Sequence, residues 1–271
     1  MAVLSPGPYA QAMNSGQKAL TIQLIGGPTA LLEIAGLRLV TDPTFDPPGD
    51  YPVGSRVLTK TKGPALGPDQ LGPVDAVLLS HDQHPDNLDK AGRQWLAQIP
   101  VILTTVEGAT RIPRATGLVA WETNRLVRPD GGHLQVTALP ARHGPQNLEH
   151  LTGPVTGFLI TGRGLPTVYI SGDNASLALV TTIAQRVPAI DVAILHAGAA
   201  RTALLGPHNL TLDSTQAARA AAILGATAVI PVHFDGWQHF SEGADALVAA
   251  FARTGQSNRL HVLTDGARFI I

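Results

Sequence analysis

Short stretches of alternating apolar and polar residues follow an N-terminal segment rich in Gly, Pro and Ser. Residues 20–25 alternate in this way, and two more strand-like runs, 30–34 and 37–40, follow after Gly-containing breaks, which predicts an antiparallel meander of short strands. Residues 1–18 are expected to form a loose lead-in. Residues 43–74 are dense in Pro and Gly, which predicts a long irregular loop of the kind that is usually functional or disordered.

From residue 75 onward, strand patterns alternate with helical patterns. The predicted strands are residues 75–80, 101–104, 134–139, 155–161, 167–170, 191–195, 229–232 and 260–263. The predicted helices are residues 87–98, 175–187, 214–224 and 243–253. The predicted order begins with consecutive strands and continues with strands that alternate with helices. This order predicts an α/β protein in which two sheets pack face to face with helices outside. No linker separates the halves, so residues 1–271 are expected to form a single domain.

Four of the predicted strands are followed by a residue that can bind a metal ion. These residues are His81, His143, Asp173 and His233. A single histidine after a strand is more often a surface or hydrogen-bonded residue than a ligand, but four such placements are much less expected by chance. Catalytic groups collect at strand ends because the scaffold is rigid there while the loops vary.

The segment His81–Asp89 carries two histidines and three carboxylates within nine residues. Imidazole nitrogens bind borderline metals, and a carboxylate can bridge two metal ions. A metal ion with an open position lowers the pKa of bound water to roughly 7, which provides hydroxide near neutral pH. The segment therefore predicts metal-dependent hydrolysis.

Composition restricts the metal ligands and the partners. The chain has no cysteine, so any metal must be held by histidine nitrogen and carboxylate oxygen. Zn is the first expectation for one or two divalent ions, with Mn, Ni or Fe as alternatives. The formal net charge of −1 provides no basic field for nucleic acid or an anionic membrane.

The sequence shows neither a secretory signal nor a membrane-spanning segment. The N-terminus lacks the basic region and apolar core of a secretory signal, and no apolar stretch approaches the roughly 20 residues of a membrane span. We therefore expect a cytoplasmic protein without stable membrane insertion that acts on a small-molecule substrate. The oligomeric state cannot be inferred from these patterns.

The order of these motifs resembles the metallo-β-lactamase superfamily, nearest to its branch of lactone hydrolases and N-acylphosphatidylethanolamine phospholipase D-like proteins. The similar segments are residues 26–46 with their Thr-Asp-Pro-x-Phe run, His81–Asp89, Pro140–His143, Ser171–Asp173 and Pro231–Phe234. The resemblance covers nearly the whole chain. It implies a four-layer αβ/βα sandwich with metal ions at one edge between the sheets.

The resemblance also implies a role for each polar residue. It assigns His81, His84 and His143 to a first metal ion, Asp86 and His233 to a second, and Asp173 to a bridge between the two. Asp86 or a bridging hydroxide would act as base or nucleophile. His208 corresponds to a histidine that lies near the substrate in this branch, so it is predicted to be catalytic.

The signature departs from the family pattern in two places. The family separates its first two histidines by one residue, whereas two residues separate His81 from His84. Either one residue is inserted after His81, which we favour, or the spacing is retained and Asp82 replaces the first histidine. In both alignments Asn87 replaces the last histidine, and its amide oxygen is a weaker ligand for Zn or Ni. The number of metal ions therefore stays open.

Other polar residues carry weaker indications. Asp42 either braces a ligand by accepting a hydrogen bond or simply forms an Asp-Pro turn, and His196 could line the pocket. Trp237, His239 and Phe240 could form a pocket wall, although a core cluster is the simpler interpretation for the two larger aromatic residues. The histidines interpreted as structural or surface residues are His133, His150 and His261.

Three functional hypotheses follow. The favoured one is a hydrolase that uses a metal-bound hydroxide on an ester, lactone or phosphodiester of a small molecule. The second is a degenerate family member that binds a small molecule or a partner without turnover, which Asn87 and the irregular histidine spacing would explain. The third, least favoured, is a redox di-iron site on the same fold, which would normally need a partner domain to deliver electrons.

Overall fold

Two sheets form the centre of the structure, a computed structural model that describes residues 20–54 and 56–271. The first sheet has the order β15 (Arg268–Ile270), β1 (Leu20–Gly26), β2 (Thr29–Ile34), β3 (Leu37–Thr41), β6 (Ala76–Leu78), β7 (Val101–Thr105) and β8 (Thr116–Leu118). The second has the order β14 (Ala228–Val232), β13 (Val192–His196), β12 (Val168–Ile170), β11 (Thr156–Thr161), β10 (His133–Pro140) and β9 (Thr123–Val127). The predicted lead-in of residues 1–18 lies outside the described residues.

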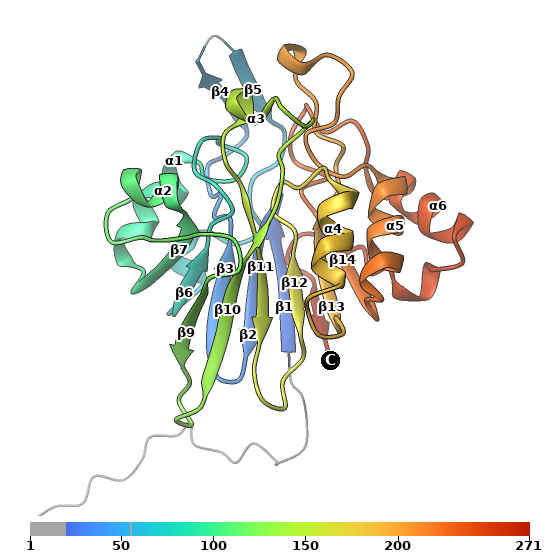
Figure 1. Ribbon diagram of the computed structural model, residues 1–271. Coiled ribbons are helices and arrows are strands. Elements are labelled where there is room, and N and C mark those ends of the chain that lie inside the picture. The colour runs from blue at the N-terminus through green and yellow to red at the C-terminus, as the bar shows by residue number, and fades with distance from the viewer. Residues whose placement is uncertain (1–19, 55) are drawn as a thin grey trace, which may run out of the picture.

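The central strands bury both faces, which explains why they appear in the sequence as nearly continuous apolar runs. Inner-face residues of both sheets, among them Leu32 and Phe158, share one core. On the outer face of the first sheet, Val77 belongs to a core with Trp95 of α1 (Lys90–Trp95) and with Ile112, which follows α2 (Val106–Arg111). On the outer face of the second sheet, Leu195 packs with α4 (Leu177–Ala184), α5 (Ser214–Leu224) and α6 (Ala244–Arg253). The predicted order of helix, sheet, sheet and helix is confirmed (Figure 1).

Side-chain caps determine where the helices begin. The Asp213 carboxylate accepts a hydrogen bond from Gln216 N at 2.7 Å, so α5 begins at Ser214 as predicted. The Asp89 carboxylate accepts from Gly92 N at 2.8 Å, so α1 begins at Lys90, later than the predicted residue 87. None of the helices in the described ranges is long and apolar enough to span a bilayer. The remaining helical segments are α3 (Glu149–Thr152) and 3₁₀ turns at Pro68–Gln70, Leu96–Gln98, Ala203–Leu205 and Ser257–Arg259.

The predicted irregular loop of residues 43–74 contains a hairpin. β4 (Gly49–Val53) pairs antiparallel with β5 (Arg56–Lys60) in a separate two-stranded sheet. Most of the described side chains in these strands are exposed or half-buried, so no regular apolar alternation marks them in the sequence. The hairpin stands above the ends of the central strands, at the top of Figure 1.

The predicted final strand, residues 260–263, is wrong. Leu260 forms only an isolated bridge to Val229, next to a hydrogen bond from His261 N to Val229 O of 2.8 Å. The apolar residues of this segment therefore lie along the edge strand β14 without joining its sheet. The chain then continues to β15, which pairs antiparallel with β1 of the other sheet. The short elements β8, β9, α2 and α3 are also absent from the predicted set.

One buried carboxylate ties the hairpin to the first helical layer. Asp89 Oδ2 accepts hydrogen bonds from Lys60 Nζ at 3.1 Å and from Asp46 N at 2.6 Å, while Oδ1 caps α1. The Lys60 and Asp89 side chains are 4% and 0% exposed. Because a buried charge is costly when it loses its partner, the position of the hairpin depends on this pair.

Replacing Asp89 by Ala should lower the free energy of unfolding by about 3–5 kcal/mol, since the Lys60 ammonium would stay buried without its partner. Urea denaturation followed by circular dichroism measures the change. The control is Lys62→Ala, which removes an ion pair to Asp235 whose side chains are 54% and 46% exposed. Lys62→Ala should lower the free energy of unfolding by no more than about 1 kcal/mol. If both variants lost the same small amount of unfolding free energy, the anchoring role of Asp89 would be contradicted.

Candidate metal centre

A tight turn after β6 brings two histidines of the signature segment together. The N–H groups of Asn87 and Leu88 both donate to the His84 carbonyl, at 3.1 and 2.9 Å. His84 Nδ1 then lies 3.1 Å from His81 Nε2. The ring of His143, which follows β10, joins them with its Nε2 at 3.2 Å from His84 Nδ1.

The spacing of these three rings matches a metal position. His143 Nδ1 donates to the Leu210 carbonyl at 2.9 Å, which leaves a lone pair on Nε2. Two nitrogens bound to a tetrahedral Zn²⁺ at about 2.0–2.1 Å lie roughly 3.3 Å apart. The distances of 3.1 and 3.2 Å between the ring nitrogens are close to that value. His81, His84 and His143 therefore form a group that could hold a metal ion, which we call the first ligand group.

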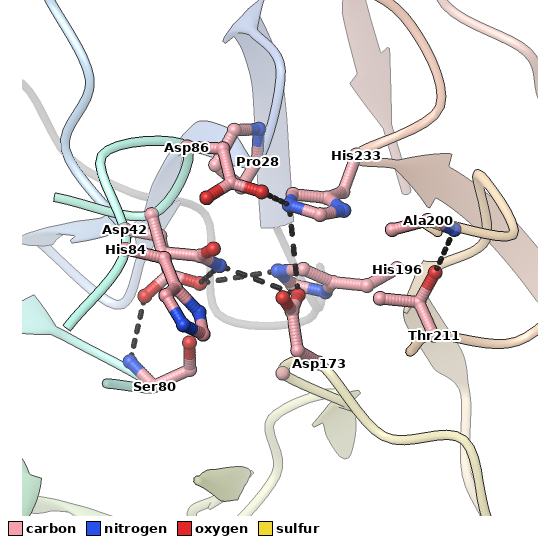
Figure 2. A network of polar contacts seen from close by, with 12 residues as sticks. Pro28, Asp42, Ser80, His84, Asp86, Asp173, His196, Ala200, Thr211 and His233 are labelled. Carbon is pink, nitrogen blue, oxygen red and sulfur yellow. Dashed lines mark hydrogen bonds and ion pairs between the residues drawn. The ribbon is translucent and has the colours of Figure 1, made fainter. Parts of the chain in front are cut away.

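Asp86, Asp173 and His233 form a second ligand group, whose ligand atoms all lie within 4.8 Å of one another. His233 Nε2 lies 3.1 Å from Asp86 Oδ2. Asp173 lies between the groups, because its Oδ2 is 3.7 Å from His143 Nε2. Its Oδ1 is 3.7 Å from His233 Nε2 (Figure 2). The six predicted ligands thus come together in two groups with one carboxylate between them.

Glycine is required immediately before the central carboxylate. Gly172 has a φ of +56°, in the left-handed region that side chains rarely adopt. A Cβ atom there would lie 2.5 Å from the Thr156 carbonyl oxygen. The chain can therefore turn sharply after β12 and direct Asp173 between the two ligand groups.

Burial keeps the ligand histidines neutral. It lowers the pKa of His143 to about 3 and that of His233 to about 4. Burial and the charges of neighbouring carboxylates raise the pKa of Asp173 well above its usual range. For Asp86, burial favours a higher pKa, but hydrogen bonds from His233 and His239 outweigh it and hold the pKa well below the usual range.

The cluster has no compensating side-chain cation. Within residues 20–54 and 56–271, the ion pairs of Asp42, Asp86 and Asp173 involve only histidines. Asp86 Oδ1 and Asp173 Oδ2 are buried and have no hydrogen-bond partner there. Neutral imidazoles and unpartnered carboxylate oxygens are the donors that a divalent cation requires, and the cation would offset the buried charge. The residues therefore fit a divalent metal centre.

Asp42 supports the cluster in the bracing manner considered from the sequence. Its Oδ1 accepts from Ser80 N at 2.6 Å, and its Oδ2 lies 3.1 Å from His196 Nε2 (Figure 2). His196 is fully buried and does not line the cavity above the cluster. Asn87 directs its amide nitrogen at two carboxylates, 3.3 Å from Asp173 Oδ1 and 3.5 Å from Asp42 Oδ2.

Two other candidates from the sequence lie outside the ligand groups. The Asp82 carboxylate is bound by Arg111 at 2.6 Å and by Arg93 at 3.2 Å, whereas His81 enters the cluster. This placement favours the alignment with an insertion after His81. His208 is exposed and does not line the cavity, so its catalytic role stays a prediction.

A small pocket that is partly open to solvent lies over the cluster. His84, Asp86 and His143 contribute to its lining, and Arg56 is the one Lys or Arg among its lining residues. The apolar lining residues are Val53, Leu58, Leu151, Ala200, Leu205 and Leu210. Val53, Arg56 and Leu58 of the hairpin belong to this lining. The sequence did not predict that the hairpin would form part of the cavity, although the unusual length of the 43–74 segment indicated a functional loop.

Known proteins share this arrangement of the chain. The beta-lactamase superfamily domain matches residues 37–234. A UPF0173 metal-dependent hydrolase from Methanosphaerula palustris is 34% identical over 185 residues, which cover 66% of this chain and 77% of that protein. An isothiocyanate hydrolase from Delia radicum gut bacteria has a TM-score of 0.78 at 22% identity, covering 92% of this chain and 98% of that one. CmlA, a diiron β-hydroxylase from Streptomyces venezuelae, has a TM-score of 0.66 at 17% identity, covering 93% and 54% respectively.

The superfamily predicted from the ordered motifs is confirmed by the domain match, which spans most of the chain. The predicted fold is confirmed by the solved structures, which superpose over nearly its whole length. The chain belongs to the beta-lactamase superfamily and is a metal-dependent hydrolase with the metallo-β-lactamase fold.

Proposed function

We propose that the chain hydrolyses the ester or lactone bond of a small, largely apolar substrate at a two-metal centre. The observation that carries the proposal is the position of Asp173 between two ligand groups, close to a cavity with mostly apolar walls. Pairs of metal ions are common in hydrolytic sites, where they act on both sides of the reacting group. The resemblance to lactone hydrolases in the sequence motifs supports the choice of bond.

The two ligand groups favour different metals. The first group, His81, His84 and His143, is all imidazole and suits Zn. The second group contains two carboxylates and suits Zn, Mn or Fe. A divalent ion bound there supplies Lewis acidity and lowers the pKa of bound water.

Asp86 is the residue that we assign to the attacking water. It lines the cavity, and the His233 and His239 rings beside it hold its pKa well below the usual range, so that it is ionised at neutral pH despite its burial. Its Oδ1 has no partner, while Oδ2 faces both histidines. A carboxylate oxygen in this position can accept a hydrogen bond from water and orient it for attack.

The cavity walls support an ester or lactone over a phosphodiester. A phosphodiester carries a permanent negative charge and would lose hydration against the apolar side chains of this cavity. An ester or lactone enters uncharged, and the carboxylate that its hydrolysis produces can pair with Arg56. An isothiocyanate, the substrate class of the structural neighbour, also combines an uncharged electrophile with an apolar body and belongs in the same substrate panel.

Replacing His143 by Ala should remove the first metal ion. It should also lower kcat/KM by more than 100-fold, because loss of a residue that only supports a ligand already costs roughly 10–100-fold. Elemental analysis after purification without chelator gives the metal content, and aryl esters and lactones give the rate. His133→Ala is the control, because that histidine is exposed at the start of β10. A fully metal-loaded wild type that binds but never turns over the panel would favour the binding-module hypothesis.

Replacing Arg56 by Gln should leave the metal content unchanged and lower kcat/KM by about 10-fold for a substrate with a carboxylate near the ester bond, because a charge-assisted hydrogen bond is lost. The matched neutral ester should change by less than about 3-fold. Comparing both substrates in one variant separates charge recognition from a general loss of activity. Equal losses on the two substrates would contradict the role of Arg56.

A further inference from the structure

The second ligand group lacks the histidine that the family signature supplies. Asn87 occupies that place and directs its amide nitrogen at Asp173 and Asp42, so its donor N–H atoms face the carboxylates instead of a lone pair. Its amide oxygen is buried and has no partner. Only His233 in this group therefore offers an imidazole nitrogen.

His239 brings another imidazole to the same carboxylate. Its Nε2 lies 3.0 Å from Asp86 Oδ2, the oxygen that His233 Nε2 approaches at 3.1 Å. These spacings are within 0.2 Å of those between the nitrogens of the first ligand group, 3.1 and 3.2 Å. His239 thus meets the second group through Asp86, with the spacing expected of two atoms bound to one metal ion.

The His239 ring is held in place by its neighbours. Gln238 N donates to Thr59 O of β5 at 3.0 Å, and Arg201 N donates to the His239 carbonyl at 3.0 Å. The Phe240 ring centre is 4.6 Å from that of His239. The His239 side chain is 11% exposed and lines the cavity. A side chain fixed in this way is suited to bind a ligand with little loss of conformational freedom.

The position of His239 in the chain also separates it from the usual ligands. The superfamily domain matches residues 37–234, so it ends one residue after His233 and before His239. His239 therefore lies beyond the residues that the domain match covers. The simplest alternative is that His239 only donates a hydrogen bond to Asp86.

We infer that His239 is a ligand of the second metal ion and supplies the imidazole that Asn87 does not. The inference rests on the two-metal centre of the proposed function. It adds His239, which contacts Asp86, to the group of Asp86, Asp173 and His233.

Metal titration without substrate tests this assignment. The chain is stripped with chelator and titrated with Co²⁺, whose visible absorption reports the number and type of ligands. Wild type should take up two ions per chain in two steps. His239→Ala and His239→Gln should both keep the first step and weaken the second by about 100-fold or more, beyond the effect of a supporting residue. The matched control, Gln238→Ala at the exposed neighbouring position, should keep both steps.

The glutamine variant separates the two roles of His239. Its amide N–H can still donate to Asp86, so retention of the second step within about 3-fold of wild type would show a hydrogen bond only and overturn the inference. A wild type that never exceeds one Co²⁺ per chain would overturn it as well. Thermal melts of the metal-free variants identify any that fail to fold, and the remaining His239 variant then decides the result. The titration contains no substrate. A failure to hydrolyse esters would therefore contradict the proposed function without changing the result for metal binding by His239.

Discussion

Negative charge buried at the ends of the central strands is the constraint on which the site depends. Asp42, Asp86 and Asp173 are almost fully buried among histidines. Asp42 is satisfied by Ser80 N and by His196, whereas Asp86 and Asp173 each keep an oxygen without a partner. This difference divides the cluster into a part that only supports and a part that requires a cation. The fold is stable around such charge only when positive charge or N–H donors surround it.

The four-layer fold and the ligand-bearing strand ends could be predicted from the sequence because both follow from local patterns. Apolar runs ending in His81, His143, Asp173 and His233 place polar groups at strand ends, whichever residues lie across the sheet. The hairpin of β4 and β5 could not be predicted in the same way, since its exposed strands are held by a buried ion pair between residues 29 positions apart. The final strand was misplaced because residues 260–263 are apolar for packing along an edge and not for pairing within a sheet.

The substitution at Asn87 illustrates a different limit of sequence reasoning. The departure from the family signature is visible in the sequence, but its compensation is not. His239 lies 152 positions from Asn87, beside Trp237 and Phe240, whose aromatic character suggests packing more than chemistry. Only the three-dimensional arrangement brings its ring to Asp86. The alternatives for Asp42 are also distinguished by contacts, because a bracing carboxylate and a turn-forming one look alike in sequence.

The hairpin and the segment after β14 are joined as one unit. Gln238 N donates to Thr59 O, Lys60 bridges to Trp237, and the Lys60 ammonium lies 5.6 Å from the centre of the Trp237 ring. The hairpin forms part of the cavity wall, and the segment after β14 places the His239 imidazole next to Asp86. A substitution that displaces the hairpin should therefore also displace the segment that carries His239, so the shape of the cavity wall and the position of this imidazole are mechanically coupled although separate stretches of chain encode them.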